Sequence, residues 1–148
     1  MSPLMVEVPV LDVRPTLSAG RDPLGDILAA VGATPPGHPL IVIAPFAPRP
    51  LLVLLGARGH ALMSVTAETE GAHVVLILVG GGLVEDLVDL EPPGPLEAVL
   101  AAAERGGPYL ARVPRFPRLL IPLLRDRGVP FASAELLDGR AVVWVGPR

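Results

Sequence analysis

The chain has 148 residues, of which 51% are hydrophobic, 18% are charged and only 3% are aromatic, and its formal net charge is −3. This composition predicts a folded protein with an aliphatic core and excludes intrinsic disorder. The acidic balance argues against a protein whose main task is to coat nucleic acid, and the absence of cysteine excludes disulfides, thiolate nucleophiles and cysteine-ligated metals.

The N-terminal sequence MSPLMVEVPV has neither the basic segment nor the long apolar segment of a signal peptide. The most apolar run, residues 39–56, is interrupted by four prolines and by Arg49, which does not fit a membrane span. We therefore expect a cytoplasmic protein without membrane contact. All twelve basic residues are arginines and 19 residues are prolines, which fits either a GC-rich genome or a thermophile.

The first 80 residues predict the order strand, helix, strand, helix, strand, strand. Residues 6–13 alternate between apolar and polar, and residues 39–44 form a continuous, mainly β-branched run that is typical of a buried strand. We expect the first helix to be capped by Asp22, to start at Pro23 and to stop at Gly32, and the second to run from Pro48 to Gly59. The stretches 60–68 and 73–80 flank TEG at 69–71, which predicts a hairpin.

The second helix, PRPLLVLLGARG at 48–59, has a counterpart in PRLLIPLLRDRG at 117–128. Aligned without gaps, residues 39–66 and 108–135 share 10 identities in 28 positions, including Ser64 with Ser133. Internal similarity at a fixed spacing indicates a repeated structural unit. With small gaps the match extends upstream and places Asp12 on Asp89.

The repeat predicts two units, residues 1–80 and 83–148, joined by a glycine hinge at 80–82. Each unit is expected to be an α/β two-layer sandwich, with a four-stranded mixed sheet covered by two helices. In the second unit, LDG at 137–139 takes the place of the hairpin turn. Strands as apolar as HVVLILVG cannot face water on both sides, so we expect the two sheets to pack together or a homodimer to cover them.

The segments LDVRP, DPLGDIL and PRPLLVLLGARG resemble the bacterial family called domain of unknown function 2249, which is similar in fold to the TusA/SirA sulfur carriers. The second unit resembles it more weakly, through VDLEP, GPLEAVL and FPRLLIPLLRDRG. The resemblance implies two tandem TusA-like units, each with the strand and helix order βαβαββ.

The chain departs from the sulfur carriers at the residue that defines them. Their cysteine precedes the proline that opens the first helix, and here Asp22 and Gly94 stand at that place. Members of the closer family often have a His-Asp pair before PRP, where this chain has Phe46-Ala47 and Arg115-Phe116. The resemblance therefore implies the fold without sulfur transfer.

Four arginines are the candidates for binding an anion or a partner: Arg49, Arg118, Arg14 and Arg115. Arg49 and Arg118 are expected one residue inside a helix, where free N–H groups and a guanidinium together favour a phosphate or carboxylate. The alternative is that each pairs with an acid at the end of its own strand, Asp12 or Asp89.

Six arginines and one acid lie between residues 105 and 127, which would suit an acidic protein or RNA. Acidic residues just upstream neutralise this charge, and the aromatic residues lack the regular spacing of a stacking platform, so a solvated face is the preferred interpretation. The three histidines lack metal-ligand spacing. No catalytic residue, metal or cofactor is predicted.

These observations favour a non-enzymatic binding or accessory protein that contacts another protein or a second copy of itself. One alternative is a small-anion binder or enzyme that uses Arg49 and Arg118. The other is an RNA-binding module, which the net charge disfavours.

Overall fold

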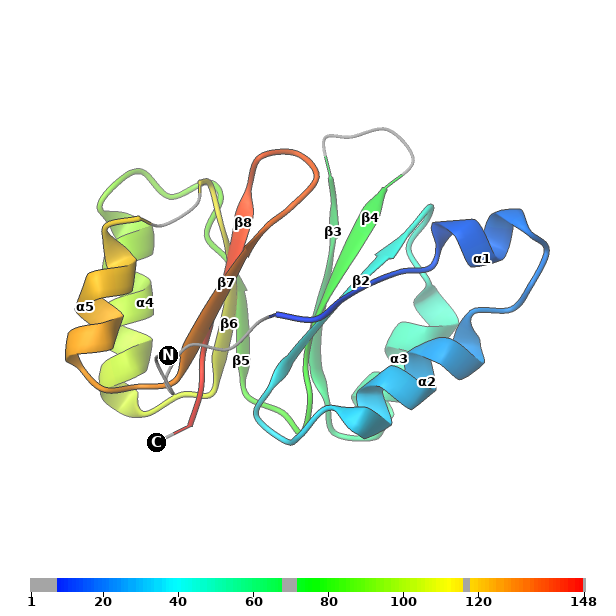
Figure 1. Ribbon diagram of the computed structural model, residues 1–148, viewed down its shortest axis with the longest axis horizontal. Helices are drawn as coiled ribbons and strands as arrows, with labels where there is room; N and C mark the ends of the chain where they lie inside the picture. The colour runs from blue at the N-terminus through cyan, green and yellow to red at the C-terminus, as the bar shows by residue number, and fades with distance from the viewer. Residues whose placement is uncertain (1–7, 68–71, 116–117, 148) are drawn as a thin grey trace.

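The computed structural model describes residues 8–67, 72–115 and 118–147 (Figure 1). The N-terminal half contains β1 (Val10–Asp12), α1 (Arg14–Ser18), α2 (Leu24–Ala33), β2 (Pro39–Ala44), α3 (Arg49–Ala57), β3 (Ala61–Thr66) and β4 (His73–Leu78). The C-terminal half contains β5 (Leu83–Asp86), α4 (Gly94–Arg105), β6 (Tyr109–Val113), α5 (Leu120–Asp126), β7 (Phe131–Glu135) and β8 (Ala141–Val145).

Each half forms one mixed sheet, with the strand orders β1-β2-β4-β3 and β5-β6-β8-β7 among the described residues. The first two strands of each half are parallel because a helical segment connects them, whereas the closing hairpin pairs antiparallel. The predicted fold class, helices with two four-stranded mixed sheets, is confirmed.

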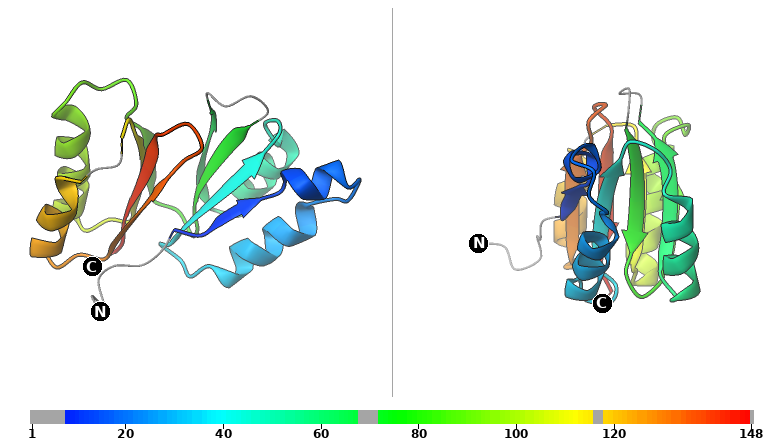
Figure 2. Two further views of the ribbon diagram at one scale, coloured as in Figure 1. Left: turned by 45° about the horizontal axis from the view of Figure 1, so that its top comes forward. Right: turned by 90° about the vertical axis from the view of Figure 1, so that its right-hand side faces the viewer.

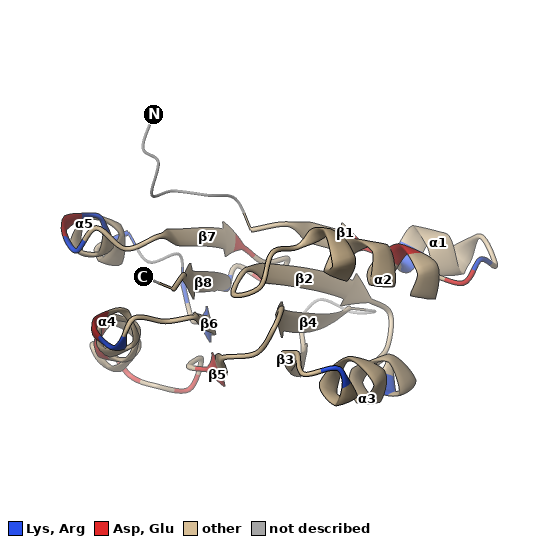
Figure 3. Cartoon of the chain, turned by 90° about the horizontal axis from the view of Figure 1, so that it is seen from below, with Lys and Arg blue, Asp and Glu red and all other residues tan. Residues whose placement is uncertain are grey.

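The two sheets pack face to face, and the helices cover their outer faces (Figures 1 and 2). The central core contains buried side chains from both sheets, among them Ile41, Leu76, Leu110 and Trp144. Strand β3 lies against β5, while β1 and β7 lie at the opposite edge (Figure 3). The strand orders thus run in opposite directions across the interface, as a pseudo-twofold axis along the strands requires.

The strand register supports the internal repeat residue by residue. Ser64 is paired with Val75 in the first sheet, and Ser133 is paired with Val143 in the second. The interface positions Leu76 and Trp144 correspond in the same way, since they pair with Ile41 and Leu110. The structure is therefore consistent with two tandem units.

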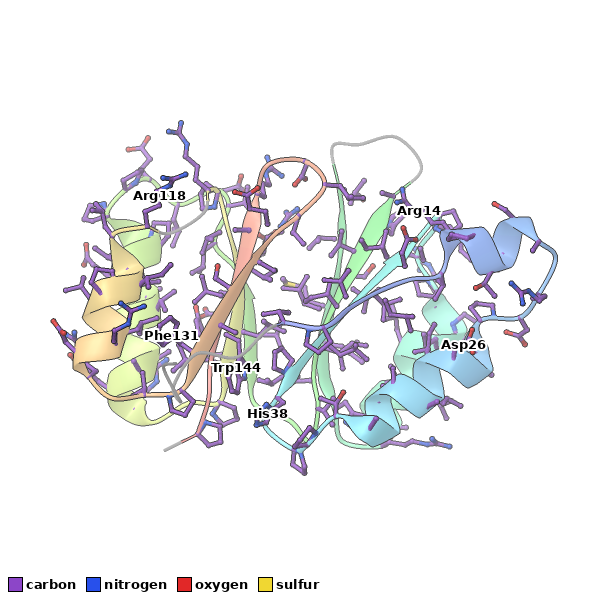
Figure 4. The ribbon with its side chains drawn as sticks, viewed as in Figure 1. Arg14, Asp26, His38, Arg118, Phe131 and Trp144 are labelled. Atoms are coloured by element: carbon purple, nitrogen blue, oxygen red, sulfur yellow. The ribbon has the colours of Figure 1, made fainter. Side chains whose placement is uncertain are left out.

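Trp144 is the main polar link between the sheets. Its indole is fully buried, and Nε1–H donates a 2.7 Å hydrogen bond to the carbonyl oxygen of Gly37 in the other half. Its ring also lies 4.7 Å from the ring of His38, centroid to centroid (Figure 4). A buried indole needs such an acceptor, since its N–H would otherwise lose the hydrogen bonds it makes to water.

The connection between the halves is a compact turn. Gly80, Gly81 and Gly82 all have positive φ, which favours glycine, and the backbone N–H of Gly80 donates to Nδ1 of His60. A Cβ on Gly82 would lie 2.5 Å from a side-chain carbon of Leu78. Backbone conformation and close packing therefore both require glycine at residue 82.

Three local predictions are wrong. Helix α1 was not expected; it follows Asp12, whose carboxylate accepts hydrogen bonds from the backbone and side chain of Arg14. Helix α2 begins at Leu24 rather than Pro23, its N-cap is Pro23 rather than Asp22, and it continues through Gly32 to Ala33. The carboxylate of Asp22, one residue before the N-cap, accepts a hydrogen bond from the N–H of Leu24. In the C-terminal half, residues 118–119 form a turn and α5 begins at Leu120, later than expected; the expected start at residue 117 itself lies outside the described residues.

Other predictions fall partly outside the described ranges. The hairpin turn at 69–71 and the first two residues of the strand expected at 6–13 cannot be compared with the structure. The turn at 137–139 is present, with Leu136 and Arg140 bonded across it. No helix in the described ranges has both the length and the apolar character needed to cross a membrane.

Candidate ligand-binding pocket

A pocket of about 800 Å³ lies in the C-terminal half, where the parallel strands β5 and β6 end. It is lined by residues in and beside the two connections that follow these strands, within 88–96, 113–115 and 118–120. The carboxyl ends of adjacent parallel strands are a common place for ligands, because both chains leave the sheet there and a crevice opens between them. The volume is within the range of small-molecule sites.

The floor of the pocket is apolar and its rim is charged. Val113 and Leu120 line it and are both buried. Arg115 and Arg118 come from the β6–α5 connection and are exposed. Guanidinium groups bind carboxylates and phosphates through paired hydrogen bonds. The pocket can therefore hold an organic anion with an apolar body.

The opposite wall carries two carboxylates, and each wall carries one exposed leucine. Asp89 and Glu91 line the pocket from the β5–α4 connection. Leu90 in the same segment is 45% exposed, and Leu119 across the pocket is 79% exposed. Apolar side chains this exposed on a pocket rim are typical of a surface that contacts a ligand or partner.

A partly buried ion pair fixes the start of the acidic wall. The side chain of Arg112 on β6 is only 7% exposed and donates two hydrogen bonds to Asp86, at 3.0 and 2.7 Å. Asp86 also accepts from the backbone N–H of Val88, the first residue of the wall, and Arg112 reaches the carbonyl of Thr66 in the other sheet. The pair thus connects the sheet interface to the pocket.

The ionisation of Asp86 follows from this pairing. Partial burial alone would raise the pKa of its carboxyl, but the hydrogen bonds and positive charge of Arg112 outweigh that effect. The pKa of Asp86 therefore lies below its ordinary value of 3.8. Asp86 is a carboxylate at neutral pH, and the ion pair is intact there.

The N-terminal half has a smaller pocket at the corresponding place. It measures about 270 Å³ and is lined by Phe46, Leu51 and Asp22, among others. Phe46 stands at the repeat position of Arg115, so an aromatic ring replaces a guanidinium. The two pockets differ in size and charge although the surrounding strands have the same order.

Of the four predicted arginines, the structure brings two together. Arg115 and Arg118 line one pocket, but Arg118 lies in a turn before α5 and not inside a helix as expected. Arg49 is the first residue of α3 and lies between Pro48 and Pro50, which line the smaller pocket. Arg14 lies in the other half, far from Arg118 (Figure 4).

The alternative interpretation, that Arg49 pairs with Asp12 and Arg118 with Asp89, is wrong. Asp12 forms its ion pair with Arg14, at 2.8 Å. Asp89 and Arg118 line the same pocket, yet no ion pair within the described residues joins them. These two rim charges are thus available to a ligand.

The arginine-rich segment 105–127 is not one surface patch. Arg112 is buried between the sheets, Arg127 contacts Glu104 at 3.7 Å, and Arg115 and Arg118 line the pocket. The described part of the chain contains no group of three His, Cys, Asp or Glu that could hold a metal.

Arg112 and Asp86 were not identified from the sequence as site residues. The repeat alignment placed Asp12 on Asp89, but strand pairing equates Asp12 with Asp86: they pair with Ile43 and Arg112, respectively. Each aspartate ends an edge strand of the structure and accepts a hydrogen bond from the N–H two residues later, a correspondence that the sequence alignment missed.

Family comparison agrees with the motifs in the N-terminal half. Residues 10–79 match the model of a family described as "Uncharacterized conserved protein (DUF2249)". No curated protein and no solved structure matches the chain significantly. The N-terminal half of the chain, through residues 10–79, therefore resembles the DUF2249 family.

Proposed function

We propose that this protein is a non-enzymatic binding or accessory protein and that it binds a small organic anion in the C-terminal pocket. The proposal rests mainly on one observation: Arg115 and Arg118 line a single pocket of about 800 Å³ whose floor is apolar. The guanidinium groups bind the anionic head, and the floor around Val113 and Leu120 accepts an aliphatic body.

The anion is organic, because the pocket offers more apolar surface than an inorganic ion can cover. Phosphate alone would contact the rim arginines but leave the floor in water. The residues at the place of the sulfur-carrier cysteine also support a binding role: Asp22 precedes α2 and accepts from the N–H of Leu24, and Gly94 begins α4. Neither side chain can form a persulfide.

Calorimetric titration with octanoate tests this proposal, with inorganic phosphate as the probe that lacks an apolar body. Octanoate is expected to bind, and phosphate to bind more weakly. The double variant Arg115→Ala/Arg118→Ala is expected to lose octanoate binding, whereas Arg49→Ala, at the repeat position of Arg118, should retain it. Equal binding by the double variant and the native chain would refute the proposal.

A protein partner or a second copy of the chain is the second candidate, because Leu90 and Leu119 expose apolar surface on the pocket rim. Burial of both would stabilise a complex by about 25 cal/mol per Å² of apolar area. Native mass spectrometry of the native chain and of Leu119→Asp tests it. A monomer in both samples, with no bound protein, would count against this candidate.

A further inference from the structure

The two walls of the C-terminal pocket carry opposite charge. Asp89 and Glu91 lie on the β5–α4 connection, and Arg115 and Arg118 lie on the β6–α5 connection. All four side chains are exposed, and among the described residues no ion pair joins them to one another. The rim therefore presents two separate charged walls.

A simple anion can form favourable ionic contacts with only one of these walls. Its carboxylate binds the arginines, but Asp89 and Glu91 then face it with the same sign of charge, which disfavours binding. A ligand that also carries a cationic group removes this conflict by placing that group against the acidic wall. The acids thus select against anions that lack a positive charge.

From this charge arrangement we infer that the ligand is a zwitterion with an apolar body, of the size of a di- or tripeptide with free amino and carboxyl ends. The inference rests on the proposed function, because it names the class of anion bound in the same pocket. Two or three extended residues span roughly 7–10 Å, and apolar side chains match the floor formed by Val113 and Leu120.

The smaller pocket does not share this arrangement. Its charged lining residue among those described is Asp22, and Phe46 stands where the C-terminal half has Arg115. A pocket with an acid and no guanidinium cannot bind both ends of a zwitterion. The inferred specificity therefore belongs to the C-terminal half.

The test is calorimetric titration of the full chain with leucyl-leucine, N-acetyl-leucyl-leucine and leucyl-leucine amide. Leucyl-leucine is expected to bind best. Acetylation removes the contacts with the acidic wall and should weaken binding about threefold to tenfold, since exposed ion pairs contribute modestly. Amidation removes the paired contacts with the arginines and should weaken binding by about tenfold or more.

Two double variants show which wall of the pocket is responsible for each loss of affinity. Asp89→Asn/Glu91→Gln should bind leucyl-leucine and its acetylated form equally, and Arg115→Ala/Arg118→Ala should lose both. Arg49→Ala is the matched control and should behave like the native chain. All of these replace exposed side chains, so the fold is expected to persist.

The outcomes separate the inference from the proposal beneath it. If octanoate binds and N-acetyl-leucyl-leucine binds as well as leucyl-leucine, the zwitterion inference is overturned while anion binding stands. If octanoate and all three peptides fail to bind, both are overturned. Preferential binding of leucyl-leucine that disappears in Asp89→Asn/Glu91→Gln supports both.

Discussion

Replacing Trp144 with phenylalanine is expected to destabilise the contact between the two sheets. The substitution removes the Nε1–H that donates to the carbonyl oxygen of Gly37, at 2.7 Å, in a fully buried environment. A buried carbonyl left without its donor costs about 1–3 kcal/mol. The smaller ring also leaves a void, and a core substitution of this kind costs about 1 kcal/mol more.

The expected loss is therefore about 2–4 kcal/mol in the free energy of unfolding. For a domain of this size each kcal/mol lowers Tm by about 4 °C, so Tm should fall by about 8–16 °C. Urea unfolding followed by far-UV circular dichroism measures the loss, because this signal does not depend on the tryptophan that is removed.

His38→Ala is the control for the ring contact. It removes the neighbouring ring at 4.7 Å but leaves the indole hydrogen bond, so it should cost about 1 kcal/mol. A loss below 1 kcal/mol for Trp144→Phe would refute the reasoning, since it would mean that the bond to Gly37 contributes little to the sheet interface.

The remaining predictions concern the interface, the ion pair and the glycines. Residues 1–80 expressed alone should aggregate because the apolar face of their sheet loses its cover, and a soluble monomer in gel filtration would contradict this. The pKa of Asp86 in the folded protein lies below its ordinary value, so the ion pair with Arg112 stabilises the fold above about pH 4. This stabilisation is lost as the pH falls through the folded pKa of Asp86. The variant Asp86→Asn should therefore show a weaker dependence of stability on pH in the acid range, measured by urea unfolding. Gly32 lies in α2 with open space around it, so Gly32→Ala should raise stability by about 0.5–1 kcal/mol. Gly107 has φ +55, and an added Cβ would lie 2.6 Å from the carbonyl oxygen of Gly146, so Gly107→Ala should lower stability by more than about 1 kcal/mol. Thermal unfolding of the two variants measures both effects.

The second helix shows what local sequence determines. Pro48 at the start and Gly59 after the end were both read from the sequence, and the structure places α3 between them with Gly59 at φ +90. These signals work because proline fits the first turn of a helix and glycine allows a left-handed residue after it. The same expectation was wrong at Gly32, because α2 does not stop there but continues one residue further, to Ala33.

The pocket shows what local sequence does not determine. Arg115 and Arg118 were candidates, but the acids that share their pocket follow a different strand, and only the pairing of β5 with β6 brings the two connections together. The similarity of VLD and LVD hid the true correspondence, because α1 adds residues after Asp12 that the C-terminal half lacks. Strand register, which no short motif encodes, decides which residues line the site.

The two halves cannot be exchanged, although their strands have the same order. At the interface position of Leu76 in one sheet the other has Trp144, and the residues paired beside them are Met63 and Ala132, so the larger ring stands beside the smaller neighbour. The indole then reaches across to the carbonyl of Gly37. Two identical N-terminal sheets would lack this donor, and two C-terminal sheets would place an indole on both sides of one interface. The sheet interface is therefore asymmetric at these positions, although the two sheets have the same strand order.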